Sequence, residues 1–65
     1  MMKMKVNNLP ANYTNYAWIV CTECEGELWF YDAWNKSEEH DARAQAWEIE
    51  RGHCYPVEAI THGYC

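Results

Sequence analysis

The stretch "YAWIVCTECEGELWFYD" (residues 16–32) has the composition of a β-hairpin. β-Branched and aromatic residues fill 16–24 and 27–32, as is typical of strands. Between them Glu25 and Gly26 form a two-residue turn in which glycine can take a positive φ. With this turn the two strands pair closely, and we expect the cross-strand pairs to be Cys21 with Phe30 and Thr22 with Trp29.

The following segment changes to a helical period. The pattern predicts a helix over 37–51, with Ser37 as the N-cap, acidic residues in the first turn and Gly52 as the stop after the last turn. A stripe at helical spacing is formed by Ala42, Ala46 and Ile49. Small side chains in this stripe favour close packing of the helix on a sheet.

The two ends of the chain complete a single domain, 1–65. Residues 1–12 are interpreted as a polar, frayed lead-in. Residues 54–61 are predicted to form a third strand, and Pro56 places that strand at a sheet edge or at its own beginning. Residues 62–65 are interpreted as a tail.

The predicted fold class is α+β, a ββαβ arrangement with a three-stranded antiparallel sheet and one helix on one face. The third strand can lie beside 27–32 in parallel or beside 16–24 in antiparallel; we expect the second arrangement, order 2-1-3. Alternation then predicts which residues point to the helix, namely Ile19, Cys21, Leu28 and Phe30. It also predicts an open face made of Trp18, Val20, Thr22, Trp29 and Tyr31. The expected core between helix and sheet is Ile19, Leu28, Phe30, Ala46, Ile49 and Val57.

Composition and charge restrict the function. Ten acidic residues face five basic ones, giving a net charge of −5, so the phosphate-neutralising chemistry of a nucleic-acid binder is missing and no direct nucleic-acid binding is expected. An acidic surface suits a protein partner with a basic surface. No apolar run is long enough to cross a membrane, and the N-terminus lacks the apolar region of a signal peptide. We therefore expect a cytoplasmic protein, in the cytoplasm of a host cell, with no membrane partner.

The cysteines raise the question of a metal. Spacing gives one possible zinc ligand set, C-x2-C-x37-H-x2-C, made of Cys21, Cys24, His62 and Cys65. Against it, Cys21 and Cys24 face opposite sides of a continuous strand, and the order 2-1-3 brings Cys54 rather than the tail near Cys24, with His53 close by. We interpret the cysteines as partly buried free thiols and expect no cofactor.

Catalysis is not expected. His53 and Cys54 are adjacent in a predicted strand, so their side chains point to opposite faces and cannot form a nucleophile and base. His40 lies among acids at the helix start. The sequence contains no glycine-rich phosphate loop or nucleophile elbow.

Three segments carry a resemblance to other proteins: "ELWFYDAW", "SEEHDARAQAWEIERG" and "PVEAI". Together they resemble a group of very small bacterial and phage-borne ββαβ proteins, over about residues 16–60. Some small acidic phage proteins of this build look like inhibitors of host defence, including anti-CRISPR proteins. The cysteines depart from that pattern, which leaves room for a metal.

These observations predict a non-enzymatic, acidic interaction protein, phage-encoded and anti-CRISPR-like, that blocks a basic nucleic-acid-binding surface of a host defence complex. The residues expected to contact the partner are Glu23, Glu25, Glu27, Trp18, Trp29, Tyr31, Trp34, Asp41 and Glu48. A homodimer through the open sheet face is a further expectation. The alternative function is a small zinc-stabilised module that uses the ligand set given above.

Overall fold

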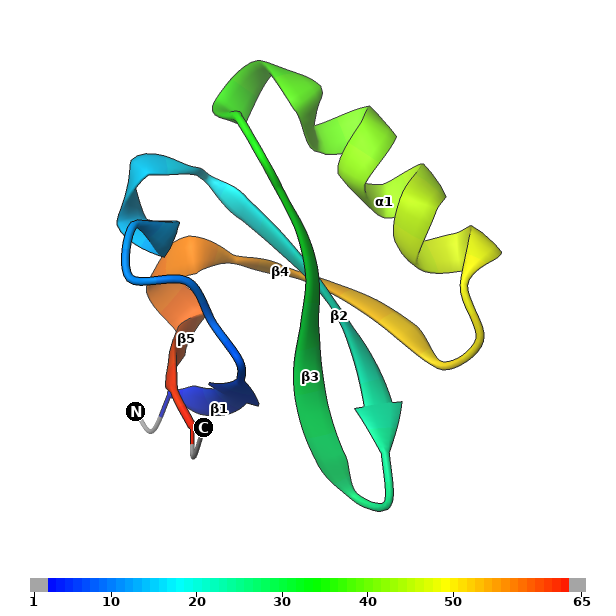
Figure 1. Ribbon diagram of the computed structural model, residues 1–65. Helices are drawn as coiled ribbons and strands as arrows, with labels where there is room; N and C mark the ends of the chain where they lie inside the picture. Colours follow the sequence, from blue (N-terminus) through cyan, green and yellow to red (C-terminus); the bar gives the residue numbers. More distant parts are fainter. Residues whose placement is uncertain (1–2, 64–65) are drawn as a thin grey trace.

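The computed structural model describes residues 3–63. Within them five strands form one mixed sheet in the order β4-β2-β3-β1-β5, and one α-helix covers part of one face (Figure 1). The predicted three-stranded antiparallel sheet is therefore wrong, although the class is α+β. The bounds are β1 (Met4–Asn7), β2 (Trp18–Cys24), β3 (Glu27–Trp34), α1 (Glu39–Glu48), β4 (Gly52–Pro56) and β5 (Ile60–His62), with 3-10 turns η1 (Tyr13–Asn15), η2 (Lys36–Glu38) and η3 (Val57–Ala59).

The central hairpin forms as its sequence predicts. Glu25 and Gly26 take φ values of 54° and 81°, the left-handed pair that suits the twist of a two-residue hairpin. From the turn up to Cys21 the register is the expected one, with Cys21 opposite Phe30. At Val20/Cys21 the register shifts, which is the signature of a β-bulge.

The predicted lead-in is a strand in the interior of the sheet. β1 runs parallel to β3 on one side, with Val6 opposite Leu28, and parallel to β5 on the other. Val6 is fully buried. As a result β1 and β5 lie side by side in Figure 1. The prediction failed because a four-residue strand with two distant partners has almost no local signal.

The single strand predicted over 54–61 is two strands at opposite edges of the sheet. β4 pairs with β2 in antiparallel, as expected for the third strand, whereas β5 pairs with β1. The break follows Pro56, whose ring removes an N–H. The chain then turns through η3, where the Val57 N–H donates to the Ala17 carbonyl (2.8 Å), and crosses to the far edge.

Helix α1 is shorter than predicted at both ends. It is preceded by η2, where the Asn35 N–H donates to Glu38 Oε1 (3.0 Å), so Ser37 is not the cap. After the helix ends, Arg51 rather than Gly52 takes the left-handed conformation (φ 56°). Gly52 has another role, because a Cβ there would collide with the Ala46 carbonyl and the Ile49 side chain.

The helix covers the face opposite to the one predicted. Val20 packs with Ala42 and Ala46 in a helix-side core, joined by the half-buried residues Trp18, Trp34, Ile49 and Cys54. The other face carries the N-terminal-side core, whose buried members are Val6, Leu9, Ile19, Cys21 and Ile60, with Leu28, Phe30 and Val57 packed against it. The predicted sorting of residues into two faces was right except at Tyr31, where the bulge interrupts the alternation, but the predicted single core joins members of both faces. Its helical members, Ala46 and Ile49, lie on the side of Val20.

Candidate interaction surfaces

The acidic tip, defined as Glu23, Glu25 and Glu27, surrounds the hairpin turn. All three residues are exposed. Glu27 Oε1 accepts a hydrogen bond from Asn7 Nδ2 (2.7 Å), and Glu23 Oε1 lies 3.5 Å from His53 Nε2. Two of the three carboxylates are thus held by neighbouring strands, while Glu25 stands at the turn itself.

Two exposed aromatic side chains follow the tip along β3. Trp29 is 41% exposed and Tyr31 is 52% exposed. Trp29 pairs with Thr22, whose hydroxyl donates to the Glu50 carbonyl (3.0 Å), so Trp29 lies on the helix face beyond the end of α1. Tyr31 is the residue that the bulge leaves without a partner on β2, which turns it out of the regular alternation.

The other two predicted aromatic contacts belong to the fold. Trp18 and Trp34 are half-buried against α1, and Trp34 Nε1 donates to Gln45 Oε1 (2.8 Å). Gln45 Nε2 in turn donates to Asp32 Oδ2 (3.1 Å). The helix thus covers Trp18 and Val20 of the face that the sequence predicts to be open, whereas Trp29 and Tyr31 stay exposed. The homodimer expected through that face stays a prediction.

The acidic residues of α1 lie apart from the tip. Asp41 and Glu48 are exposed and seven positions apart, so they share one stripe of the helix. Figure 1 shows the hairpin turn and α1 at opposite ends of the molecule. The structure therefore places the acidic tip on the same hairpin as Trp29 and Tyr31, with Glu23 and Trp29 on opposite faces of the sheet. The helical acids lie on a separate surface.

The cysteines are dispersed. Cys21 is fully buried, and burial, with a smaller contribution from Cys54, raises the pKa of its thiol to about 11. Cys24 is exposed, and Cys54 lies opposite Val20 rather than beside Cys24. Among residues 3–63 no three Cys, His, Asp or Glu side chains come together as a metal site. Cys65, the fourth member of the predicted zinc set, lies outside the described residues.

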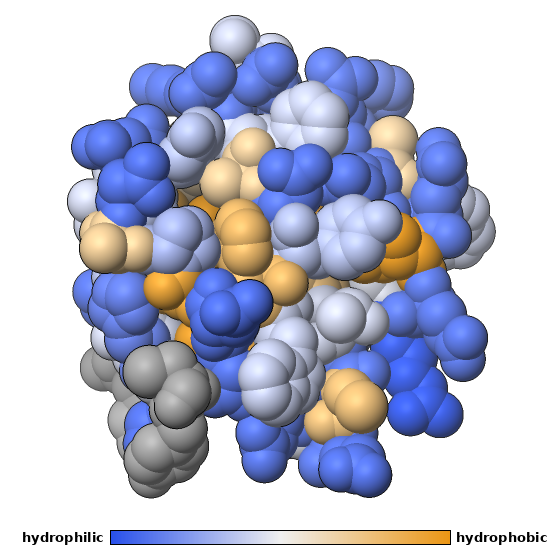
Figure 2. Space-filling model, viewed as in Figure 1, coloured by the Kyte–Doolittle hydropathy of each residue, from blue (hydrophilic) through white to orange (hydrophobic). Residues whose placement is uncertain are grey.

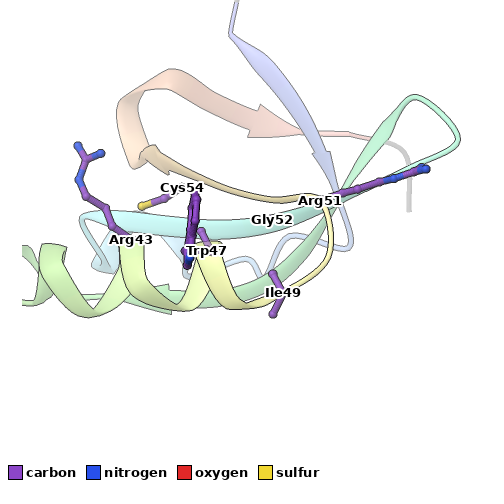
Figure 3. A pocket seen from close by; sticks show the side chains of 7 residues that line it. Arg43, Trp47, Ile49, Arg51, Gly52 and Cys54 are labelled. Atoms are coloured by element: carbon purple, nitrogen blue, oxygen red, sulfur yellow. The ribbon is translucent and has the colours of Figure 1, made fainter.

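A groove runs between α1 and β4 (Figure 3), and the sequence did not predict it. Its volume is about 470 Å³, and it is lined by Arg43, Ala46, Trp47, Ile49, Arg51, Gly52 and Cys54. Trp47 is 90% exposed. The sequence held one signal for this surface, because Trp47 is a large apolar residue that lies off the Ala42/Ala46/Ile49 stripe.

The charge of the groove is opposite to that of the tip. In Figure 3 Arg43 and Arg51 extend in opposite directions from the two ends of the groove. Arg43 is paired with Glu39 (2.8 Å) and lies 5.4 Å from the ring centre of Trp18. Burial raises the pKa of the Cys54 thiol, and the nearby Arg43 charge opposes that shift. Figure 2 shows how apolar spots on one side of this small molecule are separated by hydrophilic side chains.

Comparisons with protein-family models, curated proteins and solved structures found no match to this chain. No helix within residues 3–63 is long and apolar enough to cross a membrane.

Proposed function

We propose that the chain is a non-enzymatic binding protein that docks its hairpin on a basic surface of a partner protein. One observation carries this proposal: three exposed carboxylates and two exposed aromatic rings share one protruding hairpin. Carboxylates attract and orient a basic partner over a long range, and Trp and Tyr are the side chains that most often supply binding energy at a protein interface.

The tip is pre-organised for this role. Asn7 and His53 hold Glu27 and Glu23 from strands on either side of the hairpin, so less side-chain freedom is lost when a partner binds. The φ values of Glu25 and Gly26 fix the turn between them. A rigid row of carboxylates can occupy positions that nucleic-acid phosphates take on a basic channel.

The partner class that follows is a protein that grips nucleic-acid backbone. The resemblance to small phage-borne proteins makes a host defence complex, of the kind that anti-CRISPR proteins inhibit, the first member of this class to test. Binding of the hairpin there would exclude the nucleic acid by occupying its basic surface. The proposed activity is stoichiometric inhibition in the cytoplasm of the host cell.

A charge-reversal experiment tests this function. The immobilised chain is exposed to the heparin-retained proteins of a bacterial lysate, and we expect capture that falls with salt and is displaced by duplex DNA. Glu23→Lys with Glu25→Lys should reduce capture at least about tenfold. The matched control, Asp41→Lys with Glu48→Lys, changes the net charge equally on the separate helical stripe and should capture as the wild type does.

A second pair of variants tests whether the exposed aromatic side chains of the hairpin contribute to capture. Trp29→Ala should weaken capture at least about tenfold, whereas Trp47→Ala, on the groove, should leave it unchanged. Equal capture by the tip variant and the helix variant would show that only net charge matters, and would refute a hairpin-specific site. Circular dichroism on each variant confirms that the fold persists.

A further inference from the structure

The outer edge of β4 exposes a particular set of backbone groups. β4 is the edge strand beside β2, and the Glu23 N–H donates to the Arg51 carbonyl (3.1 Å) while the Val57 N–H donates to the Ala17 carbonyl (2.8 Å). Both bonds belong to the same antiparallel register, in which Cys21 faces His53. Because hydrogen-bonded pairs alternate with non-hydrogen-bonded ones, the N–H and C=O groups of Gly52 and Cys54 and the C=O group of Pro56 point away from β2.

Only one of these three residues offers both a donor and an acceptor. The Gly52 N–H already donates to the Ile49 carbonyl (3.2 Å), and Pro56 has no N–H. Cys54 therefore stands at the centre of the β4 edge with both backbone groups directed outward. Such a residue can exchange two hydrogen bonds with its own copy across a two-fold axis.

We propose that two copies of the chain associate through antiparallel pairing of their β4 strands, centred on Cys54. The two five-stranded sheets then form one continuous sheet, with both α1 helices on the same face. Pairing centred on Cys54 sets Gly52 opposite the partner's Pro56.

The groove supplies the apolar part of the contact. The strand that carries Gly52 and Cys54 faces the viewer in Figure 3, and Trp47 stands beside it from the helix. An added strand would lie along that edge and cover Trp47, which is 90% exposed in the single chain. Arg43 does not oppose the association, since Glu39 neutralises it at 2.8 Å.

Sedimentation of the reduced protein tests the association. The wild type should form a dimer, and Trp47→Ala should weaken it at least about tenfold, because the exposed ring contributes to binding and not to folding. Trp29→Ala, on the hairpin, should sediment as the wild type does. A wild type that stays monomeric as its concentration rises overturns the proposal, and so does a dimer that Trp47→Ala leaves unchanged.

Cross-linking gives a second measurement. Directly opposed residues in an antiparallel pair have Cα atoms about 5.5 Å apart, within reach of a short thiol cross-linker. With Cys65 changed to Ser in each variant, Cys24→Ser should still form a covalent dimer and Cys54→Ser should not. Cross-linking that depends on the exposed Cys24 instead refutes the interface. These experiments contain no basic partner, so their outcome is independent of the proposed hairpin function.

Discussion

The two faces of the sheet are stabilised in different ways. The helix-side core has a single large fully buried side chain, Val20, beneath two alanines of α1. The N-terminal-side core has no helix, yet it buries Val6, Ile19, Cys21 and Ile60 completely. In this small domain the larger core is the one to which β1 and β5 contribute, not the one covered by the helix.

The difference follows from side-chain size. Ala42, Ala46 and Gly52 let α1 approach the sheet so closely that little space remains for large residues between them. β1 and β5 lie in the sheet itself and direct long aliphatic side chains onto the opposite face. The helix therefore acts mainly as a close cover of its face, whereas β1 and β5 contribute buried apolar area to the N-terminal-side core.

The strongest test of this comparison removes the same atoms from each core. Ile60→Ala should lower the free energy of unfolding by about 3–4 kcal/mol, because Ile60 is fully buried. Ile49→Ala should cost about 1–2 kcal/mol, because Ile49 is half-buried at the end of α1. Urea denaturation measures both values. An equal cost at the two positions would break the distinction between the cores.

Alkaline pH should weaken the N-terminal-side core through Cys21. Its folded pKa of about 11 lies above its ordinary value of 9.0, because burial disfavours the thiolate. The stabilising contribution of the neutral thiol is therefore complete below pH 9 and is lost as pH rises toward 11, by about 2–3 kcal/mol in total.

Comparison with alanine variants isolates this effect from other groups that titrate in the same range. Urea midpoints between pH 8 and pH 11 should fall less steeply for Cys21→Ala than for the wild type. Cys54→Ala should change the slope less, because Cys54 is half-buried and Arg43 opposes the rise of its pKa. The same pH slope in the wild type and in Cys21→Ala would exclude a buried, neutral Cys21.

The smallest expected effect is the difference in stability between alanine substitutions at two glycines. Gly52→Ala should destabilise the protein by about 2 kcal/mol, because the added Cβ meets the backbone of Ala46 and forces α1 away from β4. Gly26→Ala meets no atom within 4 Å, but its φ of 81° costs about 1 kcal/mol for an alanine. A thermal melt of each variant ranks them, and the reverse order would argue against close packing of the helix.

The sequence predicted the parts of the fold that have local causes. The Glu25-Gly26 turn and the register at Cys21 depend on residues within a few positions of one another, and both were predicted correctly. The helix was found but extended too far, because Gly52 was interpreted as a stop when its role is close packing. β1 was missed, since its four residues become a strand only between β3 and β5.

The candidate interaction surfaces likewise include features that the sequence predicts and features that it does not. Exposure of the acidic tip was foreseeable, because three glutamates beside a turn have no other place than the surface. The location of Trp18 was not, because alternation sorts residues into two faces without stating which face the helix covers. Trp34 joins Trp18 on the helix face because the bulge shifts the alternation of β3 by one residue. The groove at Trp47 was missed because its lining comes from α1 and β4 together.

Local sequence was sufficient to derive three features: a hairpin with an acidic tip, a helix with a stripe of small residues, and the two faces of the hairpin from its turn up to the bulge. These features follow from turn chemistry and from the periods of strand and helix, which act over short distances. Three further features depend on the tertiary structure. β1 is an interior strand and β5 an edge strand, residues 54–61 divide between opposite edges of the sheet, and α1 covers the face that carries Val20. Those choices depend on contacts between residues far apart in the chain, whose energies are settled only when both cores are packed at once.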